Sequence, residues 1–139
     1  MLSRADYSYF EHGADIGIAG RGSTIEAAFV AAAQALFAIQ TEAAAIRPEQ
    51  RIEVSFTEAD VELALVSWLN VLLGEAKSRG LALAEFGLRR EEDLWTGWAS
   101  GEPWHPGLAR GTEVKGATLT MLSVRRPDQE WEARCVVDV

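Results

Sequence analysis

The residues able to carry chemistry are few and lie far apart in the chain. The sequence has two histidines, His12 and His105, and one cysteine, Cys135, among 139 residues. No segment brings carboxylates and histidines to the close spacing that a hydrolase or nuclease would use to hold a metal ion and activate water. The sequence therefore gives little support to an independent metal-dependent hydrolase.

The single cysteine excludes an internal disulfide and a cysteine-rich zinc site. Cys135 lies in Trp131-Glu-Ala-Arg-Cys-Val-Val, where apolar and polar residues alternate as they do in a half-buried strand. This setting favours a small buried side chain over a nucleophile.

The overall charge argues against direct binding of RNA. Thirteen basic and 21 acidic residues leave a net charge of -8, and no segment concentrates Lys or Arg into a stripe that could neutralise successive phosphates. An acidic surface instead suits a metal ion or a basic groove on a protein partner.

Length and composition predict one globular domain over residues 1–139, because 48% of the residues are hydrophobic and 24% are charged. The chain shows neither the long apolar run of a signal peptide nor a segment long enough to span a bilayer. We therefore expect a cytoplasmic protein without membrane contact.

Periodicity predicts two helices. Ser23-Thr-Ile-Glu26 has the form of a capping box with Ser23 as the N-cap, and the apolar residues after it, from Ile25 to Leu36, recur at helical spacing towards an end near Ile39. A second apolar stripe predicts a helix from about 60 to 79, followed by Gly80 as a left-handed C-terminal cap.

The other segments have the composition and alternation of strands: 7–12, 16–19, 52–56, 81–88, 94–100, 113–124 with an internal turn or bulge, and 131–137. The tetrapeptide His12-Gly-Ala-Asp15 would form a bend between the first two. We expect an α+β, two-layer sandwich, with a mostly antiparallel sheet and two helices packed on one face.

Short segments along this chain resemble, in order, the motifs of the archease family. They are Tyr9-Phe-Glu-His-Gly-Ala-Asp15, Thr24-Ile-Glu-Ala-Ala-Phe29, Trp68-Leu-Asn70, Gly101-Glu102, Thr112-Glu-Val-Lys115 and Val137-Asp-Val139. The resemblance implies an accessory protein, not an enzyme, that assists RtcB-type RNA ligases in tRNA splicing and RNA repair. Those ligases pass through a guanylylated histidine using GTP and manganese, and archeases are thought to promote this activation and repeated turnover.

The resemblance also implies a metal site. Asp15 and Asp138 match the two metal-binding aspartates of the family, and Val139 would complete the site through its oxygen atoms. A divalent cation such as Ca²⁺, Mn²⁺ or Mg²⁺ requires several oxygen donors at about 2.0 to 2.6 Å. The residues alone leave open that Asp15 caps a turn and that Asp138 is a solvated residue near the chain end.

Five further residues are candidates for contacts around the metal or with the partner. His12 would orient a metal-bound group or bond to backbone, and Lys115 would meet an anion of the partner or its nucleotide or stay solvated. Glu102, together with Glu113, would form an acidic docking patch or be an ordinary surface glutamate. Trp104, in a loop bounded by prolines, would insert into the partner or fold back onto the sheet.

The chain departs from the family pattern at three places. Gly13 replaces the usual threonine, Gly116 stands where alanine is common, and Leu119-Thr120 stands where the family often has Tyr-His. The principal hypothesis is a metal-binding ligase activator. The alternative is an acidic interaction module or chaperone-like protein that needs no metal.

Overall fold

The computed structural model describes residues 6–139, which form two α-helices and eight strands. The elements in chain order are β1 (Tyr7–His12), β2 (Asp15–Gly22), α1 (Ile25–Gln40), β3 (Gln50–Thr57), α2 (Val61–Arg79), β4 (Leu81–Glu91), β5 (Leu94–Pro103), β6 (Gly116–Ala117), β7 (Ser123–Arg125) and β8 (Trp131–Asp138). Two short 3-10 helices, η1 (Ala43–Ala45) and η2 (Pro127–Gln129), lie in the connections. The predicted α+β class is confirmed.

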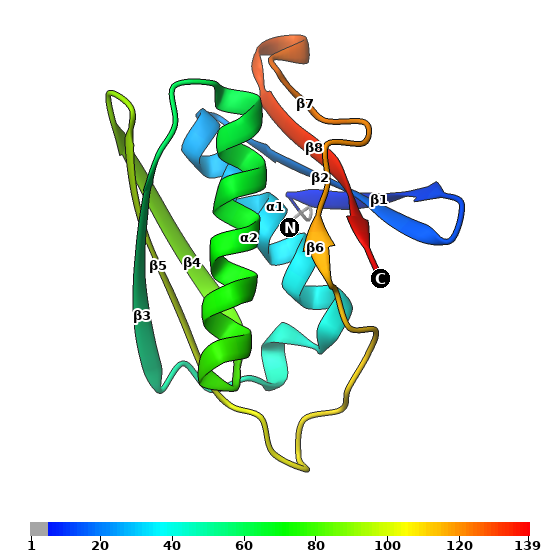
Figure 1. Cartoon of the computed structure of the whole chain (residues 1–139). Coiled ribbons are helices and arrows are strands. Elements are labelled where there is room, and N and C mark those ends of the chain that lie inside the picture. Colours follow the sequence, from blue (N-terminus) through cyan, green and yellow to red (C-terminus); the bar gives the residue numbers. More distant parts are fainter. Residues whose placement is uncertain (1–5) are drawn as a thin grey trace, which may run out of the picture.

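The strands of this part of the chain form two antiparallel sheets, where the sequence suggests one. One sheet has the order β1-β2-β8-β6, with β7 also paired to β8, and the other has the order β3-β5-β4 (Figure 1). The long segment after β5 leaves the second sheet and returns the chain to the first. The segment predicted at 113–124 is two short strands separated by a turn, and both pair with β8.

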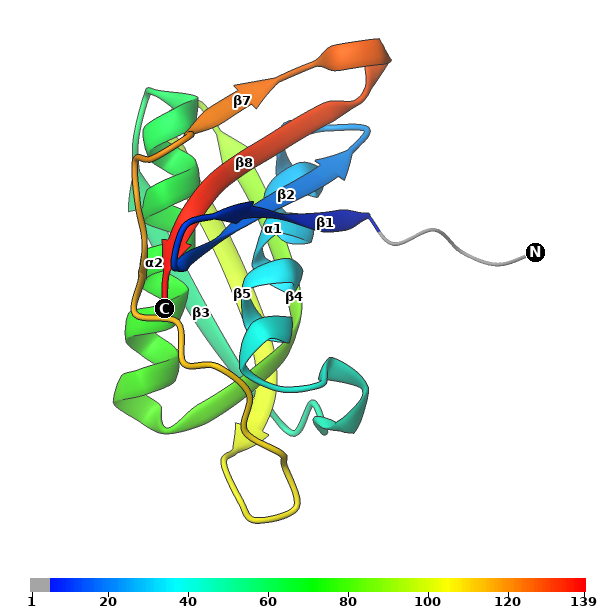
Figure 2. The same ribbon diagram turned by 90° about the vertical axis from the view of Figure 1, so that its right-hand side faces the viewer.

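Helix α1 lies between the two sheets, as Figures 1 and 2 both show. On one side the backbone of α1 at Ala28 and Ala32 comes so close to Gly20 of β2 that a Cβ there would lie 2.3 to 2.4 Å away. On the other side Phe29 stacks on Trp95 of β5, with ring centroids 5.2 Å apart. A helix that contacts neighbours on both sides is apolar nearly all round, which explains its many buried alanines.

Helix α2 packs beside α1 and contacts β3, β4 and β6. Trp68 of α2 is fully buried, and its indole Nε1–H donates to the carbonyl of Phe29 across 2.9 Å. Both helices thus cover the inner face of β3-β5-β4, as predicted, while one side of α2 stays exposed. Asn70, Gly74 and Lys77 lie on that exposed side.

The helix ends follow capping chemistry with one correction. The N-cap of α1 is Thr24, whose side chain accepts from the N–H of Ala27, and not Ser23 as predicted. The predicted end of α2 is confirmed, because Gly80 adopts φ 68° in the left-handed region.

Candidate functional site

Three neighbouring strands bring His12, Asp15 and Asp138 to one edge of the first sheet. His12 pairs with Asp15 across the β1–β2 hairpin. The register of β2 and β8 pairs Ile16 with Val137, so Asp15 and Asp138 occupy the next opposed positions. Directly opposed residues of antiparallel strands have Cβ atoms about 5 Å apart and side chains on the same face. Residues from both ends of the described chain therefore meet here.

Two backbone hydrogen bonds fix the last residues at this edge. The N–H of Val139 donates to Oδ1 of Asp15 across 3.3 Å, and the N–H of Lys115 donates to the carbonyl of Asp138 across 2.8 Å. Figures 1 and 2 both show the C-terminal end beside the β1–β2 turn and the segment that enters β6. The structure thus brings together five of the eight residues that sequence analysis selects: His12, Asp15, Lys115, Asp138 and Val139.

The two aspartates lie on the side of the sheet that faces away from α1. Ile18 and Cys135, a paired position closer to the middle of the strands, are fully buried in the core, and alternation places Asp15 and Asp138 on the opposite face. Asp138 is exposed and Asp15 is half-buried. Within residues 6–139, neither carboxylate forms an ion pair with Lys, Arg or His.

The donor set at this edge fits a hard divalent cation. Two adjacent carboxylates without a cationic partner are the ligand type that Ca²⁺, Mg²⁺ and Mn²⁺ prefer. In the described part of the chain no three side chains of His, Cys, Asp or Glu gather closely enough to hold a metal ion. A cation between Asp15 and Asp138 would therefore need further oxygens, and those of Val139 are the nearest by position in the fold.

The turn between β1 and β2 determines how Asp15 is presented. Only Gly13 and Ala14 separate the paired residues His12 and Asp15, and Gly13 has φ 59°. Glycine with positive φ at the first position of a two-residue turn is typical of a type II′ hairpin. At this position the departure from the family's threonine thus has a conformational reason.

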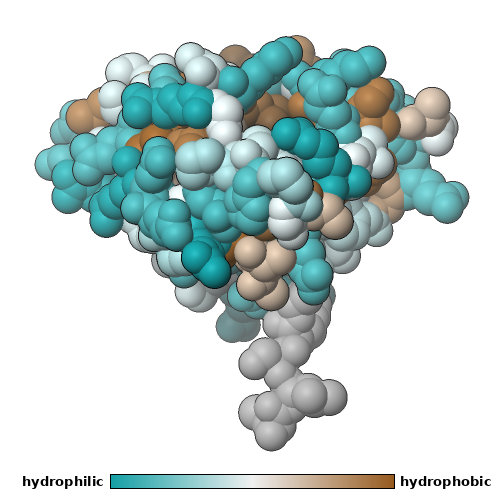
Figure 3. Space-filling model, turned by 90° about the horizontal axis from the view of Figure 1, so that it is seen from below, coloured by the Kyte–Doolittle hydropathy of each residue, from teal (hydrophilic) through white to brown (hydrophobic). Residues whose placement is uncertain are grey.

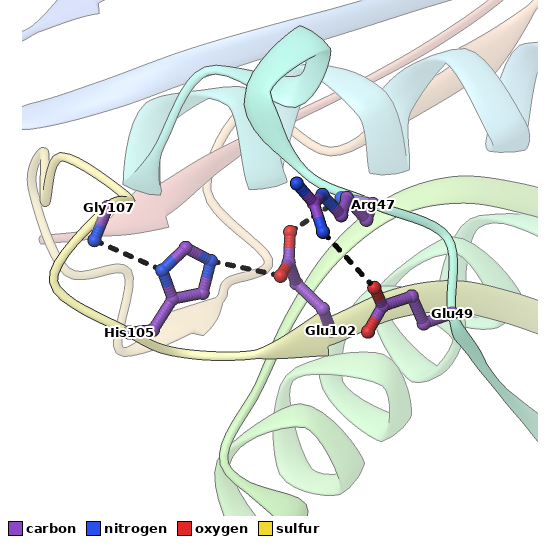
Figure 4. Close-up of polar contacts among 5 residues, drawn as sticks. All are labelled: Arg47, Glu49, Glu102, His105 and Gly107. Carbon is purple, nitrogen blue, oxygen red and sulfur yellow. Dashed lines mark hydrogen bonds and ion pairs between the residues drawn. The ribbon is translucent and has the colours of Figure 1, made fainter.

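Glu102 lies apart from this edge and is not on the surface. The residue is 5% exposed and lies at the end of β5. The carboxylate accepts from the backbone N–H of Arg47 at 2.6 Å and contacts Nε2 of His105 at 2.9 Å (Figure 4). A surface docking patch that includes Glu102 is therefore incompatible with this burial.

The hydrogen bonds around His105 determine its neutral tautomer. Nδ1 accepts from the N–H of Gly107 at 3.0 Å, so the proton of a neutral ring lies on Nε2 and is donated to Glu102 (Figure 4). The N–H of Arg47 is the main cause that lowers the pKa of Glu102, and burial opposes it. Glu102 and His105 thus tie the start of the loop after β5 to the segment before β3.

Trp104 is half-buried and packs onto a small apolar cluster of Ile46, Ala82 and Leu108. The guanidinium of Arg110 lies over its ring, 4.1 Å from the centroid. The structure therefore agrees with the alternative in which this indole folds back onto the protein. Of the other tryptophans, Trp68 and Trp95 are fully buried, and Trp98 and Trp131 are half-buried.

Cys135 lies in the core, where burial raises the pKa of its thiol to about 12. A thiol that stays protonated at neutral pH is a poor nucleophile. The predicted burial of Cys135 is confirmed.

Sequence analysis misses two cationic residues, Lys77 and Arg110. Together with Lys115 they line a cavity between α2 and the segment 104–115. No local pattern singles them out, because the cavity exists only once the loop after β5 has folded against the end of α1.

Within residues 6–139, no helix combines the length and the apolar character needed to cross a membrane.

Comparisons with known proteins point to one family. The family model described as "Archease protein family (MTH1598/TM1083)" matches residues 7–139. Protein archease of Pyrococcus furiosus is 34% identical, over 96% of this chain and 98% of its own length. Protein archease of Methanosarcina mazei is 33% identical, over 96% of this chain and 95% of its own.

Solved structures share the fold. The solution structure of Methanobacterium thermoautotrophicum protein 1598 covers 98% of this chain and 100% of its own, with a TM-score of 0.82 and 26% identity. A crystal structure from Thermotoga maritima, described as "an archease, possible chaperone", covers 94% of each chain with a TM-score of 0.64. Its 22% identity supports the fold alone. The family match over nearly the whole chain and the relatives above 30% identity lead to one conclusion: the chain belongs to the archease family.

Proposed function

We propose that this chain is a metal-binding accessory protein that activates an RtcB-type RNA ligase and has no catalytic turnover of its own. Membership of the archease family supports an accessory role. The observation that carries the metal-dependent part is the opposition of Asp15 and Asp138 on adjacent strands, with Val139 bonded to Asp15. This proximity supports the metal site that the resemblance implies.

In this proposal a divalent cation would neutralise the two carboxylates and offer a positive centre to anionic groups of the ligase or its nucleotide. Asp15 and Asp138 would bind it through their carboxylates, and Val139 through its oxygen atoms. His12 is paired with Asp15 and exposed, so it could hydrogen-bond to a metal-bound water. Lys115, whose N–H holds the backbone of Asp138, places a cationic side chain near the same edge.

The test is a multiple-turnover ligation assay with the host's own ligase, with and without this protein. We expect the wild-type chain to raise the number of turnovers per ligase, and Asp138→Ala to lose most of that stimulation. Glu11→Gln is a matched control. Glu11 is an exposed carboxylate next to His12 in the chain, but it is paired with Ile16 and therefore lies on the face of the sheet opposite to Asp15.

The outcomes separate the alternatives. Stimulation that is indifferent to Asp15 and Asp138 would favour the metal-independent interaction module or chaperone-like protein. Cleavage of RNA by the purified chain alone would favour a hydrolase instead.

A further inference from the structure

A cavity of about 650 Å³ lies between the exposed side of α2 and the segment 104–115. This volume is in the range of small-molecule sites. Three cationic side chains line it, Lys77, Arg110 and Lys115, against a single acidic one, Glu113. The protein carries a net charge of -8, whereas the side chains of this cavity carry a net positive charge. Such a local field favours an anion.

The three cations are not engaged by carboxylates of this chain. Within residues 6–139, none of Lys77, Arg110 and Lys115 forms an ion pair, and Arg110 makes a cation–π contact with Trp104. Arg79, two residues after Lys77 at the end of α2, is by contrast paired with Glu75 at 2.9 Å. The charges of the cavity are thus available to a ligand.

Hydrogen bonds hold the segments that line the cavity and engage the oxygen atoms of Gln40 and Asn70. The carbonyl of Gln40 accepts from the N–H of Gly111 at 2.7 Å, and its side-chain oxygen accepts from Val114 at 3.2 Å. The side-chain amide of Asn70 exchanges two bonds with the backbone of Ala117. A cavity held in this way is preorganised, and its charged side chains are three cationic donors and one carboxylate. A ligand that only accepts hydrogen bonds would match it.

The surrounding surface is also polar. Figure 3 views the molecule from the end where α2 terminates and the loop after β5 protrudes, and hydrophilic residues dominate it, with hydrophobic ones in small separate areas. This end offers charge recognition more than a broad apolar docking face.

We propose that the cavity binds a small molecule that carries a chain of phosphate groups. The planar fork of Arg110 would bind one phosphate through two hydrogen bonds, and Lys77 and Lys115 would act as point charges on the others. Three cations suit a ligand with several negative charges better than a single carboxylate. The proposal does not depend on the metal site.

The test is calorimetric titration of the full chain with sodium tripolyphosphate and, separately, with ATP, in EDTA and at matched ionic strength. We expect one saturable site for either probe. Charged hydrogen bonds contribute about 1.5 to 3 kcal/mol, so Arg110→Ala and Lys77→Ala should each weaken binding roughly tenfold or more. Arg126→Ala removes an exposed cation remote from the cavity, in the turn before β8, and should leave the affinity unchanged.

Equal affinity for the two probes would assign recognition to the phosphate chain, and tighter binding of ATP would add contacts from the nucleoside; either result supports the proposal. Absence of saturable binding by the wild-type chain would overturn it. So would an equal loss of affinity in Arg126→Ala, because binding would then follow net charge alone. Lys77→Ala guards against a folding artefact, since Lys77 is exposed and unpaired among the described residues, and its thermal unfolding should match wild type.

Discussion

The backbone N–H of Val139 donates to Oδ1 of Asp15 across 3.3 Å, although 124 positions separate the two residues in the chain. The β2–β8 pairing makes this contact possible, because it sets Asp15 opposite Asp138. Two like charges on opposed strand positions repel and destabilise the sheet. The same pair becomes favourable when a cation lies between them.

This relationship predicts opposite effects of Asp138→Asn without and with metal. In EDTA the variant should melt slightly above wild type, because one of two repelling charges is gone. With Ca²⁺ or Mn²⁺ at a hundred times its Kd, wild type should gain about 2.7 kcal/mol, and the variant should gain much less. Thermal unfolding monitored by circular dichroism measures both.

Glu11→Gln provides the comparison. It removes an exposed carboxylate that lies on the face of the sheet opposite to Asp15, because Glu11 is paired with Ile16. It should keep the full metal-dependent rise in Tm. An undiminished rise in Asp138→Asn would show that any bound cation lies elsewhere.

Local sequence patterns predict the helices and most strands well, since helical spacing and the Gly80 cap are properties of contiguous residues. They do not predict two sheets, because the pairing of β2 with β8 joins distant segments. They also miss how fully α1 is buried. An apolar stripe of large side chains reveals only one contact face of the helix. Ala31, Ala33 and Ala35 are also buried, but alanine is common on exposed and buried faces alike, so the pattern does not reveal the other contact faces.

The candidate site likewise depends on contacts between segments that are distant in the sequence. Asp15 and Asp138 are found through the family resemblance, and no spacing rule relates two aspartates that far apart. Glu102 is misjudged because its carboxylate accepts from the backbone N–H of Arg47, which lies in the connection before β3 and far away in the sequence. Lys77 and Arg110 are invisible to pattern analysis because the cavity that unites them depends on tertiary contacts.

The Glu102 contacts predict a pH-dependent stability. Since the pKa of Glu102 is lowered from 4.5 in the folded protein, its ionised form stabilises the fold above that value. This stabilisation is lost as the pH falls through the lower pKa of the folded state. Glu102→Gln should therefore melt below wild type at pH 7, and the difference should shrink at pH values below 4.5. A difference in Tm that stayed constant between pH 7 and pH 3 would contradict the assigned role of the charge.

The β1–β2 turn predicts a cost for restoring the family's threonine. Gly13 has φ 59°, where a β-branched residue is strained. Gly13→Thr should lower the free energy of unfolding by about 1 to 2 kcal/mol, and Gly13→Asn by less, because asparagine tolerates the left-handed region. Urea unfolding compares the two variants, and equal losses would argue that the turn changes its backbone instead of bearing the strain.

Two glycine-to-alanine changes should shift stability in opposite directions. At Gly20, buried on β2, a Cβ would lie 2.3 Å from the N of Ala32 and 2.4 Å from the O of Ala28, so β2 and α1 must separate. Overpacking of this kind costs about 1 to 3 kcal/mol or more. Gly74 is exposed inside α2, and a Cβ there meets nothing within 4 Å. Gly74→Ala should thus stabilise by about 1 kcal/mol through helix propensity. Urea unfolding of both variants measures the packing of α1 against β2, and a neutral Gly20→Ala would mean that this contact is looser than described.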